Sequence, residues 1–224
     1  AIAKSFFHWA VSRRYLTASP FADVRPTGKV NTGKPQLRID EARRFVAAAE
    51  SEFDKTGSPL AVGVLLALFM GLRAGEVLGR CVRDVDDDGQ TLWIDAGKTR
   101  HARRHLEVPA LLRPRLLSLI SGRVPTEPLF LDGEGRVPSR QALHRMVRRL
   151  CERAQVPPVC THSLRGLYAT LAVRSGAVTH AVAASLGHHS FAVTERHYAE
   201  PAEVANAATV HVLKILDRLL PSRN

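Results

Sequence analysis

The chain has 224 residues, of which 45% are hydrophobic, and this is enough for one sizeable globular core. Its net charge of +11 and its pI near 10.4 point to a polyanionic partner. No run of roughly 18 apolar residues is present, which excludes a membrane-spanning helix. Three cysteines without a CxxC pair argue against a zinc site and for reduced thiols in a cytoplasmic protein.

Arginine dominates the basic residues, because only six of the 32 Lys and Arg residues are lysines and 26 are arginines. The planar guanidinium matches pairs of phosphate oxygens, so this bias favours phosphate recognition. A GC-rich genome would give the same bias. A basic charge is also shared by ribosomal, heparin-binding and membrane-surface proteins, so charge alone leaves the partner open.

The first 25 residues predict one amphipathic helix that ends before Pro20. Its apolar stripe consists of Phe6, Phe7, Ala10, Val11 and Leu16. A single helix cannot bury its own apolar face, so we expect either a truncated domain at 1–25 or packing on the rest of the chain. Segment 26–36 is rich in Gly, Pro, Thr and Lys and predicts an exposed linker, with a second domain at 37–224.

The second domain begins with helical patterns and then changes to strands. A helix is predicted from Asp40 to Phe53, and an apolar one from Leu60 to Met70 is ended by Gly71. A short helical turn follows at 76–78. Apolar residues around the turn sequence DDDGQ then predict a small three-stranded antiparallel sheet: Val82, Val85, Leu92, Ile94, Leu106 and Val108.

The rest of the chain is predicted to be helical. The expected helices cover 110–121, 139–155, 162–175, 178–186, 190–199 and 202–220. The predicted fold class is therefore mainly α with a small antiparallel β-sheet (α+β).

Six residues in one order can bind, protonate or attack a phosphodiester: Arg73, Lys98, His162, Arg165, His188 and Tyr198. His162 and Arg165 stand at i, i+3, which puts both on one face of a helix. Lys98 is the only lysine between Thr56 and Val212. A general acid must release its proton, which arginine effectively cannot, so this isolated lysine favours catalysis over an ordinary hairpin tip. Together these residues predict DNA strand cleavage.

Four segments carry a family resemblance. GLRAGEVLGR, GKTRHARRHLEVP, HSLR and LGHHSFAVTERHY resemble, in this order, the catalytic segments of the tyrosine recombinase (phage integrase) family, over roughly residues 37–200. The opening helix, ending in YLTASPFADV, is similar to the last helix of the family's core-binding domain. The resemblance implies the tyrosine recombinase catalytic-domain fold. It also implies a site-specific recombinase or integrase, of the kind that mobile elements use, acting through a covalent 3′-phosphotyrosine.

On this resemblance Tyr198 is the nucleophile, because attack by a phenolic oxygen conserves the phosphodiester energy without a metal or cofactor. Arg73 and Arg165 would bind the non-bridging oxygens, and Lys98 would protonate the leaving 5′-oxygen. His162 and His188 would serve proton transfer or bind phosphate oxygens, and which does which stays open.

Glu76 would orient Arg73, although an ordinary helical ion pair at i, i+3 accounts for it as well. Two sets of basic residues are expected to contact DNA. The first set, in the predicted hairpin, is Arg100, Arg103 and Arg104. The second, on the helix 139–155, is Arg140, His144 and Arg148.

The expected partner is double-stranded DNA, with a cytoplasmic, nucleoid-associated location. The helix 202–220 would either dock on a neighbouring protomer of a homotetramer on paired DNA sites or pack on its own domain. A type IB topoisomerase and a non-recombining DNA-binding accessory protein are the alternatives, and a metal-dependent nuclease lacks clustered acids. A metal site at His188, His189 and His197 is not favoured, because HExxH is absent.

Overall fold

The computed structural model describes residues 2–24, 34–95, 103–175, 177–187 and 212, and it divides into compact units at 1–33 and 34–224. The division lies inside the segment predicted to be a linker. The assignment of the first unit to a core-binding domain stays a prediction.

The first unit contains α1 (Ile2–Ser12), which is shorter than the sequence predicted. Arg14 has a left-handed backbone with φ 61°, and the amides of Arg14 and Tyr15 donate to the carbonyls of Val11 and Ala10, each at 2.9 Å. This pair of hydrogen bonds closes a helix end, so the helix stops well before Pro20.

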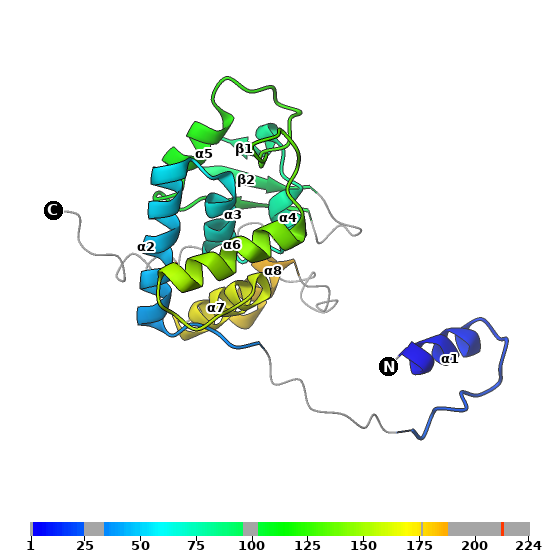
Figure 1. The fold of residues 1–224 in the computed structure, drawn as a ribbon. Coiled ribbons are helices and arrows are strands. Elements are labelled where there is room, and N and C mark those ends of the chain that lie inside the picture. Colours follow the sequence, from blue (N-terminus) through cyan, green and yellow to red (C-terminus); the bar gives the residue numbers. More distant parts are fainter. Residues whose placement is uncertain (1, 25–33, 96–102, 176, 188–211, 213–224) are drawn as a thin grey trace. The chain divides into compact units, whose positions relative to one another are not determined.

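The core of the second unit is built around α3 (Pro59–Phe69), which packs on α2 (Ile39–Thr56). All residues of α3 from Ala61 onward are buried, whereas α2 buries only one face. α3 also contacts α6 (Arg140–Arg153) and α7 (Thr161–Arg174) (Figure 1). An apolar helix without a polar face can only be stable at the centre of such a bundle.

The predicted sheet is confirmed, and its strands are antiparallel in the order β1-β2-β3. They are β1 (Val85–Asp86), β2 (Thr91–Ile94) and β3 (Arg104–Glu107), with a short 3-10 turn η1 (Val82–Asp84) before them. The turn residues Asp87, Asp88 and Gly89 all have positive φ, as the sequence DDDGQ favours. Lys98 lies outside the described residues.

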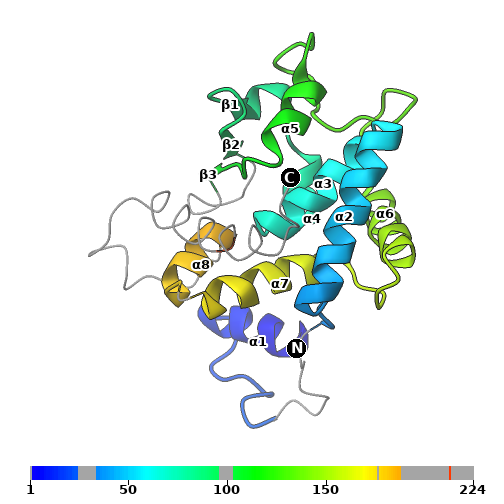
Figure 2. The same cartoon turned by 90° about the vertical axis from the view of Figure 1, so that its left-hand side faces the viewer.

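The remaining described helices are α4 (Ala74–Leu78), α5 (Arg113–Ile120) and α8 (Thr179–Leu186). α7 and α8 lie side by side (Figure 2). The predicted helix 190–199 lies outside the described residues. Of 202–220 only Val212 is described, and it is fully buried in the apolar core. The fold is mainly α with a small antiparallel sheet, as predicted, and no helix of the described part is long and apolar enough to cross a membrane.

Candidate functional site

Four chain segments meet around the carboxylate of Glu76. Gly71 follows α3 with φ +65°, which turns the chain so that Arg73 stands at the N-cap of α4 with an extended backbone. Glu76 lies in the first turn of α4, Arg104 begins β3, and Arg165 lies in α7. The site is therefore held by the bundle and the sheet together.

Glu76 accepts hydrogen bonds from two arginines. Its Oε2 accepts the backbone N–H of Arg73 at 2.8 Å, and its Oε1 accepts Nη1 of the same residue at 2.9 Å. The guanidinium of Arg104 donates to both oxygens, at 3.3 Å and 3.2 Å. Arg165 Nη1 lies 3.8 Å from Oε2. The predicted Arg73–Glu76 contact is thus present, as one part of a larger ion cluster.

The last carbonyl groups of α8 accept from the same arginines. Leu186 O accepts Arg73 Nη1 at 3.2 Å and Arg165 Nη2 at 2.6 Å, while Gly187 O accepts Arg73 Nη2 at 3.5 Å. Arg165 Nη1 also donates to Gly71 O. Carbonyls at a helix C-terminus carry partial negative charge, so they help to hold the cations in place.

Among the residues that the structure describes, the cluster carries more positive than negative charge. Burial alone would raise the pKa of Glu76, but the charge and hydrogen bonds of Arg104, and then the backbone N–H of Arg73, keep it below its usual value. Burial, and then repulsion by Arg73, lower the pKa of Arg165 to about 10. Three guanidinium groups face one carboxylate, and the Arg73 side chain is 44% exposed. This arrangement can bind an anion that approaches from solvent.

The other predicted catalytic residues are distributed differently. His162 is exposed in the first turn of α7, one turn before the buried Arg165. Lys98, His188 and Tyr198 lie outside the described residues, as does Arg100. The structure therefore brings together Arg73, Glu76 and Arg165 out of the predicted set.

Arg104 does not lie on a DNA-facing surface, although its place in the basic hairpin predicts that it would. Its side chain is only 2% exposed and is paired with Glu76. β3 alternates between faces, so Arg104 shares the inner face with Leu106 and Val108. The alternation of positions 104, 106 and 108 in the sequence predicts this shared inner face, although the neighbouring basic residues favour an exposed position for Arg104. We propose no DNA contact for Arg104.

The predicted basic face of α6 is largely exposed. Arg140 and Arg148 are exposed and His144 is half-buried, and Arg103 is also exposed just before β3. A Cβ added to Gly75 would lie 2.9 Å from Arg140 Nη2. The guanidinium of Arg140 is thus packed over the first turn of α4, two residues from Arg73.

The sequence match decides the family. Residues 35–204 match the Phage integrase family. The chain belongs to this family, the tyrosine recombinases. It is 32% identical over 203 residues to tyrosine recombinase XerC of Mycobacterium tuberculosis (strain ATCC 25177 / H37Ra), a match that covers 86% of this chain and 67% of that protein. It is 27% identical over 209 residues to tyrosine recombinase XerC of Myxococcus xanthus, covering 88% and 68%.

Solved recombinase structures share its fold. The Tn1549 transposon integrase in complex with circular intermediate DNA matches with a TM-score of 0.65 at 19% identity, covering 88% of this chain and 74% of that one. The integrase from mycobacterium phage Brujita matches with a TM-score of 0.61 at 18% identity, covering 99% and 70%. The chain is a tyrosine-type site-specific recombinase. Its described residues contain no group of three His, Cys, Asp or Glu side chains that could hold a metal ion.

Proposed function

We propose that this recombinase breaks and rejoins double-stranded DNA through a covalent 3′-phosphotyrosine formed by Tyr198. The observation that carries the proposal is the positive cluster in which Arg73 and Arg165 are already fixed around Glu76. A scissile phosphate bound at the exposed side of Arg73 would complete the charge balance of this cluster.

The arrangement favours the transition state over the ground state. A phosphate under attack becomes pentacoordinate and gains negative charge, and donors that are already oriented stabilise it without reorganising. Arg73 is held by Glu76 and by the end of α8, and Arg165 by two carbonyls. Removing one such donor costs about 3–4 kcal/mol, or roughly 100- to 1000-fold in rate, by precedent from other enzymes.

The reaction that we propose removes a proton from the Tyr198 hydroxyl and delivers a proton to the leaving 5′-oxygen. The Tyr198 oxygen forms a bond to phosphorus while the bond from phosphorus to the 5′-oxygen breaks. One of the two histidines, His162 or His188, accepts the phenolic proton while the other binds a phosphate oxygen, and Lys98 donates a proton to the departing 5′-oxygen. A free 5′-hydroxyl later attacks the phosphotyrosine and reverses the step. No metal or cofactor takes part in this mechanism.

Double-stranded DNA is the proposed partner. Its backbone would contact the exposed Arg103, Arg140 and Arg148, and His144 would lie beside them. The net charge of +11 supports this, and so do the DNA complexes of the similar Tn1549 integrase and of XerH recombinase bound to its difH substrate. We also propose a homotetramer on paired sites and a cytoplasmic, nucleoid-associated location.

The test is covalent capture of DNA. The chain is incubated in EDTA with a labelled pool of nicked duplexes of randomised sequence, and adducts that survive denaturation are recovered and sequenced. We expect adducts with the wild-type chain and none with Tyr198→Phe, because only the hydroxyl differs. Adducts that persist in Tyr198→Phe would refute the nucleophile, and dependence on added magnesium would refute the metal-free mechanism.

A second assay separates recombination from relaxation. Supercoiled plasmids that carry one or two copies of a captured site are incubated with the chain. Exchange between the two sites supports recombination. Relaxation that needs neither site would support the type IB topoisomerase alternative.

A further inference from the structure

We propose that Arg104 is a positioning residue for recombination, which holds the carboxylate of Glu76 and the C-terminal end of α8 where they direct Arg73 and Arg165 toward the scissile phosphate. This inference rests on the proposed function. Arg104 is not itself placed to touch DNA, because its side chain is only 2% exposed. Its effect must therefore pass through the groups that it holds.

The first group is the Glu76 carboxylate. Arg104 donates to both of its oxygens, and a planar guanidinium that binds both oxygens of a carboxylate leaves it one orientation. In that orientation Glu76 also accepts the backbone and the side chain of Arg73. Without Arg104 the carboxylate could rotate or become protonated, and Arg73 would lose its fixed partner.

The second group is the end of α8. Arg104 Nε donates to Ser185 O at 2.8 Å, and the next two carbonyls, of Leu186 and Gly187, accept from Arg73 and Arg165. One guanidinium thus fixes the turn whose other carbonyls orient the two phosphate-binding arginines.

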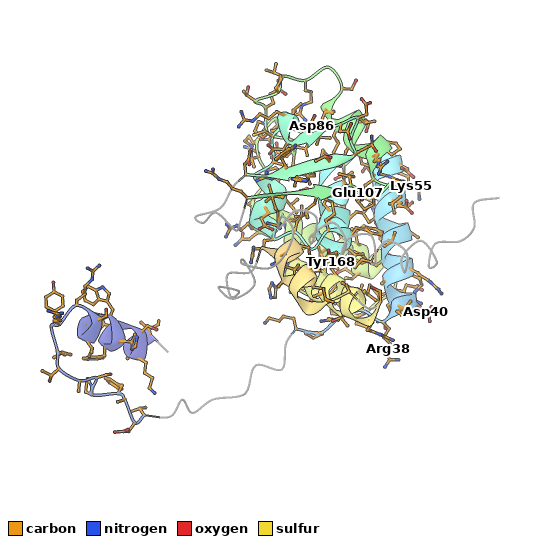
Figure 3. The ribbon with its side chains drawn as sticks, turned by 180° about the vertical axis from the view of Figure 1, so that it is seen from behind. Arg38, Asp40, Lys55, Asp86, Glu107 and Tyr168 are labelled. Carbon is orange, nitrogen blue, oxygen red and sulfur yellow. The ribbon has the colours of Figure 1, made fainter. Side chains whose placement is uncertain are left out.

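Ser185 is also held from α7. Tyr168, labelled in Figure 3, is fully buried, and its hydroxyl donates to Ser185 Oγ at 3.1 Å. The Ser185 hydroxyl in turn donates to Val182 O at 2.8 Å. The end of α8 is therefore anchored from α7 on one side and from β3 on the other. A loss of Arg104 would remove the β3 anchor and leave the α7 anchor intact, so α8 would remain folded while its last turn changed position.

The experiment compares Arg104→Met with a matched control, Arg115→Met. Arg115 is also mostly buried, with its side chain 11% exposed, and it extends from α5 to pair with Glu50 at 3.1 Å and Asp54 at 3.2 Å, both on α2. Both variants lose a paired arginine, but only the first loses a partner of Glu76. The readout is the rate of adduct formation on a captured duplex, measured from acid to neutral pH, together with a thermal melt.

We expect Arg104→Met to slow adduct formation by about 10- to 100-fold, the effect seen in metalloenzymes when a residue that orients a metal-binding side chain is removed, and Arg115→Met to leave it near the wild-type rate. As the pH falls, Arg104→Met should also lose activity at a higher pH than the wild-type chain does, because Glu76 takes up a proton more easily without its partner cation. Glu76→Gln in the same background should remove that acid limb. Arg104→Lys, which keeps the charge but not the fork, should be intermediate.

A rate and a pH profile of Arg104→Met that match those of Arg115→Met would overturn the inference. If Arg104→Met does not melt cooperatively, Arg104→Lys decides, and a wild-type rate and profile in that variant would count against the positioning role. A wild-type chain that forms no Tyr198-dependent adduct removes the proposed function and this inference with it. An adduct formed equally well by wild type and Arg104→Met removes the inference alone.

Discussion

Gly71 and Gly57 offer a matched pair of substitutions that separates backbone strain from packing at the site. Both glycines have φ +65°, so alanine at either position places a Cβ in the left-handed region. A Cβ at Gly57 would meet nothing within 4 Å. A Cβ at Gly71 would lie 2.6 Å from Leu186 Cδ2 and 2.7 Å from Tyr168 Cδ1.

The difference predicts two magnitudes. The left-handed backbone costs an L residue about 1–2 kcal/mol, which is the expected loss in free energy of unfolding for Gly57→Ala. Overpacking a buried site adds about 1–3 kcal/mol, so Gly71→Ala should lose about 2–5 kcal/mol. Leu186 and Tyr168 are both buried, so neither can move into open space to relieve the contact.

Urea unfolding followed by circular dichroism measures both variants, and covalent capture measures their activity. Gly71 O accepts a hydrogen bond from Arg165, so a shift of this turn should also slow adduct formation, whereas Gly57→Ala should not. Equal losses of stability in the two variants would refute the packing argument. A wild-type capture rate in Gly71→Ala would refute the link between this turn and the arginine.

Two further predictions concern the charges. Glu76→Gln should lower the free energy of unfolding by about 3–5 kcal/mol near neutral pH, because it leaves buried guanidinium groups without their carboxylate. The pKa of Glu76 is lowered in the folded protein, so the stability that its charge contributes is complete above the usual carboxyl range and is lost as the pH falls through the folded-state pKa. Urea unfolding at a series of acid pH values should therefore show the free energies of unfolding of wild type and Glu76→Gln converging. Arg140→Ala should make the slope of log K for DNA binding against log salt concentration shallower by about one unit. Gly75→Ala, whose Cβ would displace the Arg140 guanidinium, should change the slope in the same direction. Arg136→Ala, at an exposed loop arginine paired with Asp132, is the control, and an equal slope change in it would contradict the assignment.

The fold was predictable from the sequence where periodicity was strong. The apolar run of α3, the amphipathic α2 and the strands around DDDGQ all appear where residue spacing placed them. The end of α1 was missed because a left-handed Arg14, and not the later proline, closes it. Glu76 was found as a partner of Arg73 because the two are i, i+3 neighbours. Arg104, separated from Glu76 by 28 positions, could be joined to it only by knowing how β3 lies against α4.

The cluster also explains how arginine side chains can remain charged in a largely buried site before a phosphate binds. A buried guanidinium pays a desolvation penalty, and here one carboxylate and three carbonyls at the end of α8 offset it for three arginines. Arg165 has its pKa lowered only to about 10, so it remains a cation at neutral pH. Binding of a phosphate would then require no proton uptake by Arg165. We therefore expect that deprotonation of Arg165 does not lower the wild-type capture rate at any pH below about 9. A fall in rate as the pH rises near neutrality must come from the titration of another group.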